Sequence, residues 1–155
     1  MSSAFETLRM RPWRAPDIGL IAAIERQAYP FPWPEGVLLD CFEAGHHGWV
    51  AAGRGGRVAA YAIVQPVIDE AHLLNICTAP DWQGQGVGRG MLRWVMSACR
   101  ELGMQRMLLE VRASNLPALH LYRSEGFTED GVRKGYYPAS GGREDAILMS
   151  RFLGD

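Results

Sequence analysis

The sequence predicts one α/β domain with a mixed, mostly antiparallel central sheet and flanking helices, and three observations lead to this prediction. The chain has 155 residues, of which 48% are hydrophobic and 21% charged, as is usual for a single folded domain. Alternating apolar runs typical of strands lie on both sides of a strong helical pattern. No internal repeat, long linker or low-complexity stretch divides the sequence. We therefore expect a single domain over residues 1–155.

The first third of the chain predicts one strand and two helices. Thr7 to Trp13 alternates between polar and apolar residues and can form the first strand. Pro16 and Asp17 open the first helix, and the apolar residues between Ile18 and Ala28 keep roughly helical spacing. Tyr29 to Pro34 contains three prolines, which exclude a helix there. A short helix is expected from Glu35 to Ala44.

The middle of the chain predicts three strands and a long helix. Gly48 to Ala52 and Arg57 to Val67 flank the glycine-rich turn Gly53 to Gly56, a pattern typical of a hairpin. Ala71 to Thr78 is a third strand-like run. Val87 to Leu102 has the clearest helical spacing of apolar residues in the sequence.

The last third returns to strands. Arg106 to Arg112 is a compact apolar strand, and Leu116 to Ser124 is a helix that ends near Gly126. Two final strands are expected within Phe127 to Tyr137 and Glu144 to Phe152. One strand–helix–strand unit therefore lies in the middle of an otherwise antiparallel arrangement.

Composition disfavours several classes of protein. The formal charge of −1 and pI of about 6.4 lack the basic excess of a nucleic-acid-binding protein. No apolar run approaches the roughly 18 residues of a membrane span, and Met1 to Arg11 has no apolar signal core. We expect a cytoplasmic protein that binds neither nucleic acid nor membrane directly.

A metal site or a disulfide framework is also not expected. The three cysteines Cys41, Cys77 and Cys99 are odd in number, and none pair at C-x-x-C spacing. The four histidines show no spacing typical of metal ligands.

The sharpest motif lies between Pro80 and Gly90, where a strand-like run passes into the long helix. Four glycines in seven residues allow backbone N–H groups to converge, and the helix N-terminus adds a positive dipole end. Together they predict an anion site suited to a diphosphate. The alternative is a tight strand-to-helix turn with no ligand.

The spacing of this motif excludes two common phosphate loops. The Walker pattern needs Lys followed by Ser or Thr, and here Arg89 and Gly90 follow Gly88. The dinucleotide pattern G-x-G-x-x-G also fails from either Gly84 or Gly86. The pattern Q-x-x-G-x-G fits, and it resembles the pyrophosphate loop of the GNAT superfamily of acyl-CoA N-acyltransferases. One departure is that Gly84 and Gln85 stand where basic residues are often found.

A second motif adds to this resemblance. Leu109 to Asn115, followed by Tyr122, is similar to the second GNAT signature, in which an Asn at a helix start contacts the CoA arm and a Tyr faces the reacting sulfur. Asn115 and Tyr122 are about two helical turns apart, so they share a face. The alternative for Tyr122 is a core residue. The resemblance implies acetyl-CoA as co-substrate and parallel central strands that splay apart to hold it. The residues that it implies for acetyl-CoA binding are Ile76, Cys77, Thr78, Gln83, Gly84, Gln85, Gly86, Val87, Gly88, Arg89, Asn115 and Tyr122.

Glu110 interrupts an apolar strand, where a carboxylate must be paired or face a cleft. Its functional interpretation is a general base, acting directly or through water, with Tyr122 as the general acid. The alternative is a structural pair with Arg106, Arg112 or another arginine.

The aromatic and proline-rich segments Tyr29 to Trp33 and Gly135 to Pro138 extend the resemblance over nearly the whole chain. With Leu109 to Asn115 they are similar to the bacterial ribosomal-protein-alanine N-acetyltransferase (RimI) group. That implies transfer of an acetyl group to a protein N-terminus with a small first residue, such as alanine of a ribosomal protein. The alternative for the aromatic residues is that they only cap the core. The implied acceptor-binding residues are Phe31, Trp33, Asn75, Tyr136 and Tyr137.

Three other functions stay open. The first is acetylation of a small-molecule amine or of lysine, and the second is a non-catalytic acyl-CoA sensor, against which the joint presence of Glu110 and Tyr122 argues. The third is a nucleic-acid-binding module, for which this sequence has neither the charge nor an aromatic RNA-binding motif.

The acceptor decides how strong a base the enzyme needs. The ordinary pKa of an α-amino group is about 7.7–8.0, against about 10.4 for lysine, so acetylation of an N-terminus needs the weaker base.

Overall fold

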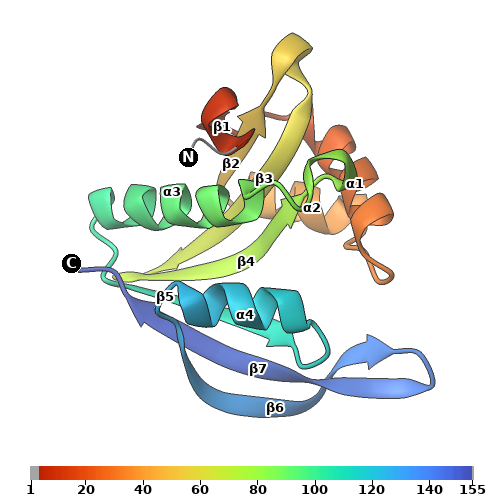
Figure 1. Ribbon diagram of the computed structural model, residues 1–155, viewed down its shortest axis with the longest axis vertical. Helices are drawn as coiled ribbons and strands as arrows, with labels where there is room; N and C mark the ends of the chain where they lie inside the picture. Colours follow the sequence, from red (N-terminus) through yellow and green to blue (C-terminus); the bar gives the residue numbers. More distant parts are fainter. Residues whose placement is uncertain (1–3, 155) are drawn as a thin grey trace.

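The computed structural model describes residues 4–154, and these residues form one seven-stranded sheet with helices on both faces (Figure 1). The strands are β1 (Arg9–Pro12), β2 (His47–Ala52), β3 (Val58–Val67), β4 (Glu70–Thr78), β5 (Arg106–Arg112), β6 (Thr128–Ala139) and β7 (Gly142–Phe152). The helices are α1 (Asp17–Ala28), α2 (Glu35–Glu43), α3 (Val87–Glu101) and α4 (Leu116–Ser124), with 3-10 turns η1 (Ala4–Thr7), η2 (Arg54–Gly56) and η3 (Pro80–Trp82).

Most predicted elements are present, with small shifts at their ends. The first strand begins at Arg9 rather than Thr7, because Ala4–Thr7 form a 3-10 turn. The turn is closed by a hydrogen bond in which Leu8 N donates to Phe5 O. The hairpin turn is also a 3-10 turn, closed by a 2.8 Å hydrogen bond from Gly53 N to Arg57 O. Residues 1–3, the start of the segment considered as a signal sequence, lie outside the described residues.

The sheet order is β1-β2-β3-β4-β5-β7-β6, and only β4 and β5 are parallel. The predicted mixed, mostly antiparallel sheet is therefore confirmed. The parallel pair is joined through α3, which is the expected strand–helix–strand unit.

Alternation along the strands divides the core into two layers. Trp49 and Ala51 of β2 pack toward α3 and α4, whereas Val50 and Ala52 pack toward α1 and α2. Figure 1 shows α3 over the β2–β4 part of the sheet and α4 over the β5–β7 part. The two helices on this face therefore belong to different halves of the sheet.

The two halves separate between β4 and β5. Pairing runs only from Glu70 with Arg106 to Leu73 with Leu109, although both strands continue beyond it. The pairing of β4 with β3 shifts by one residue at Leu74, and such a bulge bends a strand and increases its twist. The predicted splaying of the central parallel strands is confirmed, and the opening lies inside the sheet.

Candidate active site

A cavity of about 800 Å³ lies where β4 and β5 separate. We call it the large cavity. Its walls come from both strands, α4, the proline-rich segment after α1, and β6. The predicted site residues that line it are Phe31, Trp33, Asn75, Ile76, Glu110, Asn115, Tyr122 and Tyr137. Residues far apart in sequence are therefore brought to one place.

The predicted diphosphate loop, Gln83–Gly88, leads into α3. Gly84 and Gly86 have φ angles of 74° and 81°, in the left-handed region that favours glycine. Gly86 is the N-cap residue and has no side chain with which to cap the helix. The first amides of a helix have no intrahelical acceptor, so they are open to an anion. This geometry fits a diphosphate.

Two glycines at the start of α3 have different surroundings. A Cβ on Gly88 would meet only Thr78 Oγ1 within 4 Å, at 3.5 Å, so the space beside its Cα is otherwise open. A Cβ on Gly90 would lie 2.4 Å from the Phe5 ring, so Gly90 allows η1 to pack on α3. Gly88 is therefore suited to close approach by a ligand, whereas Gly90 has a packing role.

The polar side chains of the loop, from Gln83 to Arg89, form hydrogen bonds or ion pairs with other parts of the protein. Gln83 Nε2 donates to Thr78 O at 3.0 Å, and Gln85 Nε2 donates to Asp81 O at 3.0 Å. The Arg89 guanidinium pairs with Glu125, which joins α3 to the end of α4. Backbone amides, rather than unpaired cationic side chains, are therefore the groups that this loop offers to an anion.

Tyr122 enters the large cavity from the α3 and α4 face of the sheet. It is buried, and burial, followed by the nearby Tyr137, raises the pKa of its hydroxyl. It therefore keeps its proton, as a general acid must. Asn115 caps α4, since its Oδ1 accepts from Ala118 N at 3.2 Å, and it also lines the cavity. The expected common face of Asn115 and Tyr122 is present.

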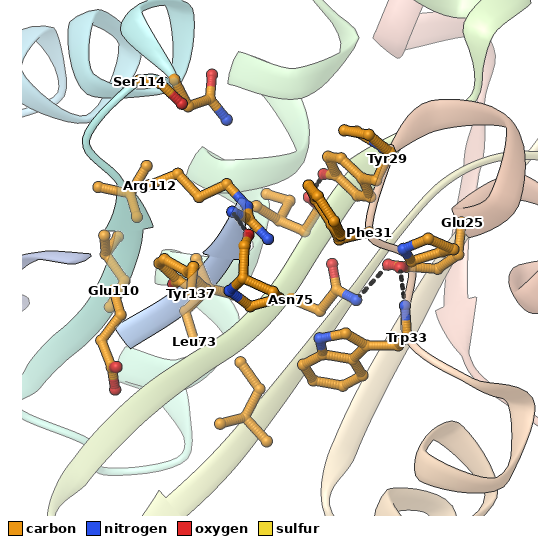
Figure 2. A pocket seen from close by; sticks show the side chains of 18 of the residues that line it. Glu25, Tyr29, Phe31, Trp33, Leu73, Asn75, Glu110, Arg112, Ser114 and Tyr137 are labelled. Atoms are coloured by element: carbon orange, nitrogen blue, oxygen red, sulfur yellow. Dashed lines mark hydrogen bonds between the residues drawn. The ribbon is translucent and has the colours of Figure 1, made fainter. Parts of the chain in front are cut away.

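Glu110 comes from the opposite face. Its neighbours on β5, Leu109 and Val111, pack in the core layer under α3 and α4, so Glu110 projects the other way. In Figure 2 its side chain runs away from Arg112, and its carboxylate lies at the edge of the pocket. Tyr122 and Glu110 thus approach the same opening from the two sides of the sheet.

The structural alternative for Glu110 was an ion pair with Arg106, Arg112 or another arginine. The first two of these pairs do not form within residues 4–154. Arg106 pairs with Glu70 and Asp130, and Arg112 pairs with Glu144, so neither neutralises Glu110. The side chains that contact its carboxylate at ion-pair distance are His72, with Nε2 3.4 Å from Oε1, and Arg133, with Nη1 3.8 Å from Oε2. No hydrogen-bond donor within residues 4–154 reaches Oε2, although this atom is buried.

Arg112 connects the two aromatic segments. Its guanidinium carbon lies 4.9 Å from the Phe31 ring centroid and 4.6 Å from that of Tyr137, a cation–π distance on each side (Figure 2). Its Nη1 donates to Pro138 O at 2.7 Å and to Glu144 Oε1 at 2.8 Å. Ser114 N donates to Glu144 Oε2 at 3.2 Å, and the hydrogen bonds from Arg112 and Ser114 hold the pKa of Glu144 below its usual range. Arg112 therefore fixes the spacing of the cavity walls.

Sequence patterns missed Glu25, the buried carboxylate of α1. Glu25 Oε1 accepts from Tyr61 Oη at 2.9 Å. Figure 2 shows its other two hydrogen bonds, in which Oε1 accepts from Asn75 Nδ2 at 2.5 Å and Oε2 accepts from Trp33 N at 2.8 Å. It ties the proline-rich segment to β4 beside the cavity. A signal existed, because Glu25 lies four residues after Ile21 on the apolar face of the helix, where a carboxylate must be satisfied.

Three more predicted residues have distinct positions. Cys77 is buried beside Tyr61 and Tyr29, and burial raises the pKa of its thiol to about 11. Thr78 ends β4 beneath Gly88. Tyr136 is 41% exposed, lies outside the large cavity and packs edge-on against Tyr137.

Comparisons with known proteins agree with this arrangement. Residues 18–127 match the acetyltransferase (GNAT) family. A ribosomal protein bS18-alanine N-acetyltransferase of Escherichia coli (strain K12) is 42% identical over 127 residues, covering 82% of this chain and 85% of that protein. The crystal structure of the ribosomal-protein-S18-alanine N-acetyltransferase from Escherichia coli has a TM-score of 0.90 at 37% identity, covering 96% of this chain and 95% of that one.

A more distant structure shows the same fold. A GNAT superfamily phosphinothricin acetyltransferase from Sinorhizobium meliloti, crystallised in complex with AcCoA, has a TM-score of 0.81 at 24% identity, covering 96% of this chain and 89% of that one. Separately, none of the helices within residues 4–154 has the length and apolar character needed to cross a membrane.

Proposed function

The chain belongs to the acetyltransferase (GNAT) family, and from this premise we propose that it transfers the acetyl group of acetyl-CoA to the N-terminal α-amino group of a protein. The proposed acceptor is a ribosomal protein that begins with alanine, as the names of its relatives indicate for those proteins. The single observation that carries the proposal is the large cavity, where Tyr122 and Glu110 meet from opposite faces of the opened sheet.

Acetyl-CoA binding rests on the loop and the opening together. The amides at Gly86 to Gly88 are available to the diphosphate, and the space before Gly88 admits it. Between Leu74 and Thr78, β4 has no strand partner on the β5 side within residues 4–154, and Leu74, Asn75 and Ile76 line the large cavity there. A backbone N–H near Ile76 or Cys77 would polarise the thioester carbonyl there.

Proton transfers are assigned to the two ionisable groups. The amine attacks the acetyl carbon, the C–S bond breaks, and Tyr122 donates its proton to the leaving thiolate. Glu110 accepts the proton that the amine loses, through a water where the carboxylate does not reach the nitrogen. Glu110 does not need to contact the amine directly, because part of the α-amino groups are already neutral near neutral pH and a weak base is then sufficient.

The acceptor preference rests on the rigid walls of the cavity. Arg112 holds Phe31 and Tyr137 at a fixed spacing, and Glu25 anchors the amide of Trp33. Aromatic side chains fixed in this way give a narrow passage with little room for a bulky first residue. A peptide that enters with a small first residue brings its amine toward Glu110.

A competition experiment tests the proposal. Acetyl-CoA is incubated with a peptide beginning with free alanine, the same peptide blocked at its N-terminus but carrying an internal lysine, and a small polyamine, and release of free CoA is followed. We expect the free N-terminus to react fastest by a wide margin. Preference for the lysine peptide or the polyamine would overturn the N-terminal assignment. Trp33→Ala should raise KM for the alanine peptide and leave KM for acetyl-CoA nearly unchanged.

A further inference from the structure

A second cavity, of about 300 Å³, lies behind Glu110. It is lined by the end of β3 and by β4, β5, β6 and β7, and among the described residues it shares only Leu109 and Glu110 with the large cavity. Its polar lining residues are Glu70, His72, Glu110, Asp130 and Arg133. Glu110 is therefore the polar group that stands between the two cavities.

His72 lies beside the Glu110 carboxylate on the side of the second cavity. In the register of the parallel strands, His72 of β4 lies opposite Leu108 of β5. Glu110 is two residues further along β5, so it projects from the same face of the sheet and is the diagonal neighbour of His72. The His72 side chain is 32% exposed and its Nε2 is 3.4 Å from Oε1. Arg133 is 54% exposed, and its guanidinium stacks on Tyr136 at 4.7 Å. His72 is thus the better placed of the two to fix the carboxylate.

We propose that His72 is a positioning residue for Glu110, holding its carboxylate at the second cavity and, through its own charge, controlling how well Glu110 serves the acceptor. The inference rests on the proposed role of Glu110 as base. It adds a contact that the reaction scheme above does not use, since His72 touches neither the acceptor nor acetyl-CoA in that scheme.

The two charge states of the imidazole have opposite effects. A neutral imidazole can donate one hydrogen bond to the carboxylate and orient it, leaving the carboxylate able to accept a proton. A protonated imidazole forms an ion pair, which makes a carboxylate a poorer proton acceptor and draws it toward the second cavity. The enzyme should therefore lose activity when His72 becomes charged.

The other charges around Glu110 are of types that do not change near neutral pH. Glu70 on β4 and Asp130 on β6 both pair with Arg106 of β5, at 3.9 Å and 3.6 Å. Arg133 of β6 keeps its positive charge, and Tyr137 of β6, whose pKa burial and then Glu110 raise to about 12, stays neutral. Among these groups, histidine is the type that changes charge between about pH 5 and 8.

A double-mutant cycle tests the contact. His72→Leu and Glu110→Gln are made singly and together, with His120→Leu, at an exposed position of α4, as the control. We expect His72→Leu to lower kcat about three- to tenfold when Glu110 is present, within the range that residues in contact show. It should lower kcat no further when Glu110 is already glutamine. Equal losses in both backgrounds would show that His72 acts on the fold alone, and would overturn the proposal.

A pH profile provides the second readout, using His72→Gln, which keeps a neutral donor. In the parent enzyme, log(kcat/KM) for the alanine peptide should fall more steeply on the acid side than the slope of about 1 that protonation of the amine alone gives, because a charged imidazole also weakens Glu110 as a base. In His72→Gln the slope should stay near 1, with kcat near neutral pH closer to the parent than in His72→Leu. Identical slopes in parent and variant would overturn the proposal.

The two proposals fail in different ways. If the parent acetylates no N-terminal peptide, the proposed function is wrong. If Glu110→Gln is as active as the parent, the base assignment fails and the role of His72 with it. If Glu110→Gln is impaired while the His72 losses are additive, only the inference about His72 fails. Melting temperature and acetyl-CoA affinity, measured for each variant, identify any that fold poorly.

Discussion

Gly88→Ala should stabilise the protein and weaken acetyl-CoA binding at the same time. Gly88 is the second residue of α3, and an added Cβ would meet only Thr78 Oγ1 at an ordinary contact distance of 3.5 Å. Replacing glycine by alanine in a helix gains up to about 1 kcal/mol. For a domain of this size that raises Tm by about 2–4 °C.

The loss of affinity follows from the space that the new methyl group occupies. A phosphate oxygen must approach an amide nitrogen to about 2.7–3.2 Å, whereas a methyl carbon holds other atoms at about 3.5–4.0 Å. The diphosphate must then withdraw from the amides of the first turn. We expect acetyl-CoA affinity to fall at least tenfold, which is about 1.4 kcal/mol, with a larger fall for Gly88→Val.

Gly19→Ala is the matched control. Gly19 is the third residue of α1, and an added Cβ there meets nothing within 4 Å. It should raise Tm by a similar amount and leave acetyl-CoA affinity unchanged. Calorimetric titration and thermal melts of the parent and the three variants give acetyl-CoA affinity and Tm. Parental affinity in Gly88→Ala would refute the loop assignment, and a lowered Tm would refute the account of the space around Gly88.

Three further predictions follow from contacts described above. Tyr122→Phe should lower kcat about 10²–10⁴-fold with little change in acetyl-CoA affinity, and a loss within about threefold would show that Tyr122 only packs. Arg112→Lys should raise KM for the alanine peptide several-fold while KM for acetyl-CoA holds, because lysine keeps the charge and loses the planar stacking, and an unchanged peptide KM would contradict this. Asp17→Asn should destabilise the protein by about 1.5–3 kcal/mol near neutral pH, measured by denaturant melts, since it weakens the charge-assisted hydrogen bonds of a part-buried pair with Arg11. The hydrogen bonds from Arg11 lower the pKa of Asp17, so this stability is present above the usual carboxyl pKa of about 3.9 and disappears as pH falls through the lower folded value; a pH-independent difference would refute it.

Local patterns were enough to predict the helices and strands. α4 runs from Leu116 to Ser124 as expected, because Asn115 caps its start and Gly126, with a φ of 92°, follows its end. α3 ends one residue earlier than expected, before Gly103 at a φ of 91°. These signals act within a few residues, so a single sequence contains them.

Contacts between distant segments could not be predicted in the same way. Glu25 binds Tyr61 and Asn75, which are 36 and 50 residues away, and no local spacing identifies such partners. The position of Arg112 between Phe31 and Tyr137 depends on the packing of three elements. The large cavity was expected only through family resemblance, and the catalytic roles of Glu110 and Tyr122 remain predictions.

The opening between β4 and β5 has a consequence for handling the protein. From Leu74 to Thr78, β4 pairs with β3 on one side and, within residues 4–154, with no strand on the other. Single side chains contact this stretch instead of a strand: Tyr29 Oη donates to Ile76 O at 2.9 Å, and Gln83 Nε2 donates to Thr78 O at 3.0 Å. An unpaired strand edge is a template for intermolecular pairing. We therefore expect ligand-free preparations to aggregate more readily on storage and to exchange these amide hydrogens faster than preparations kept with CoA.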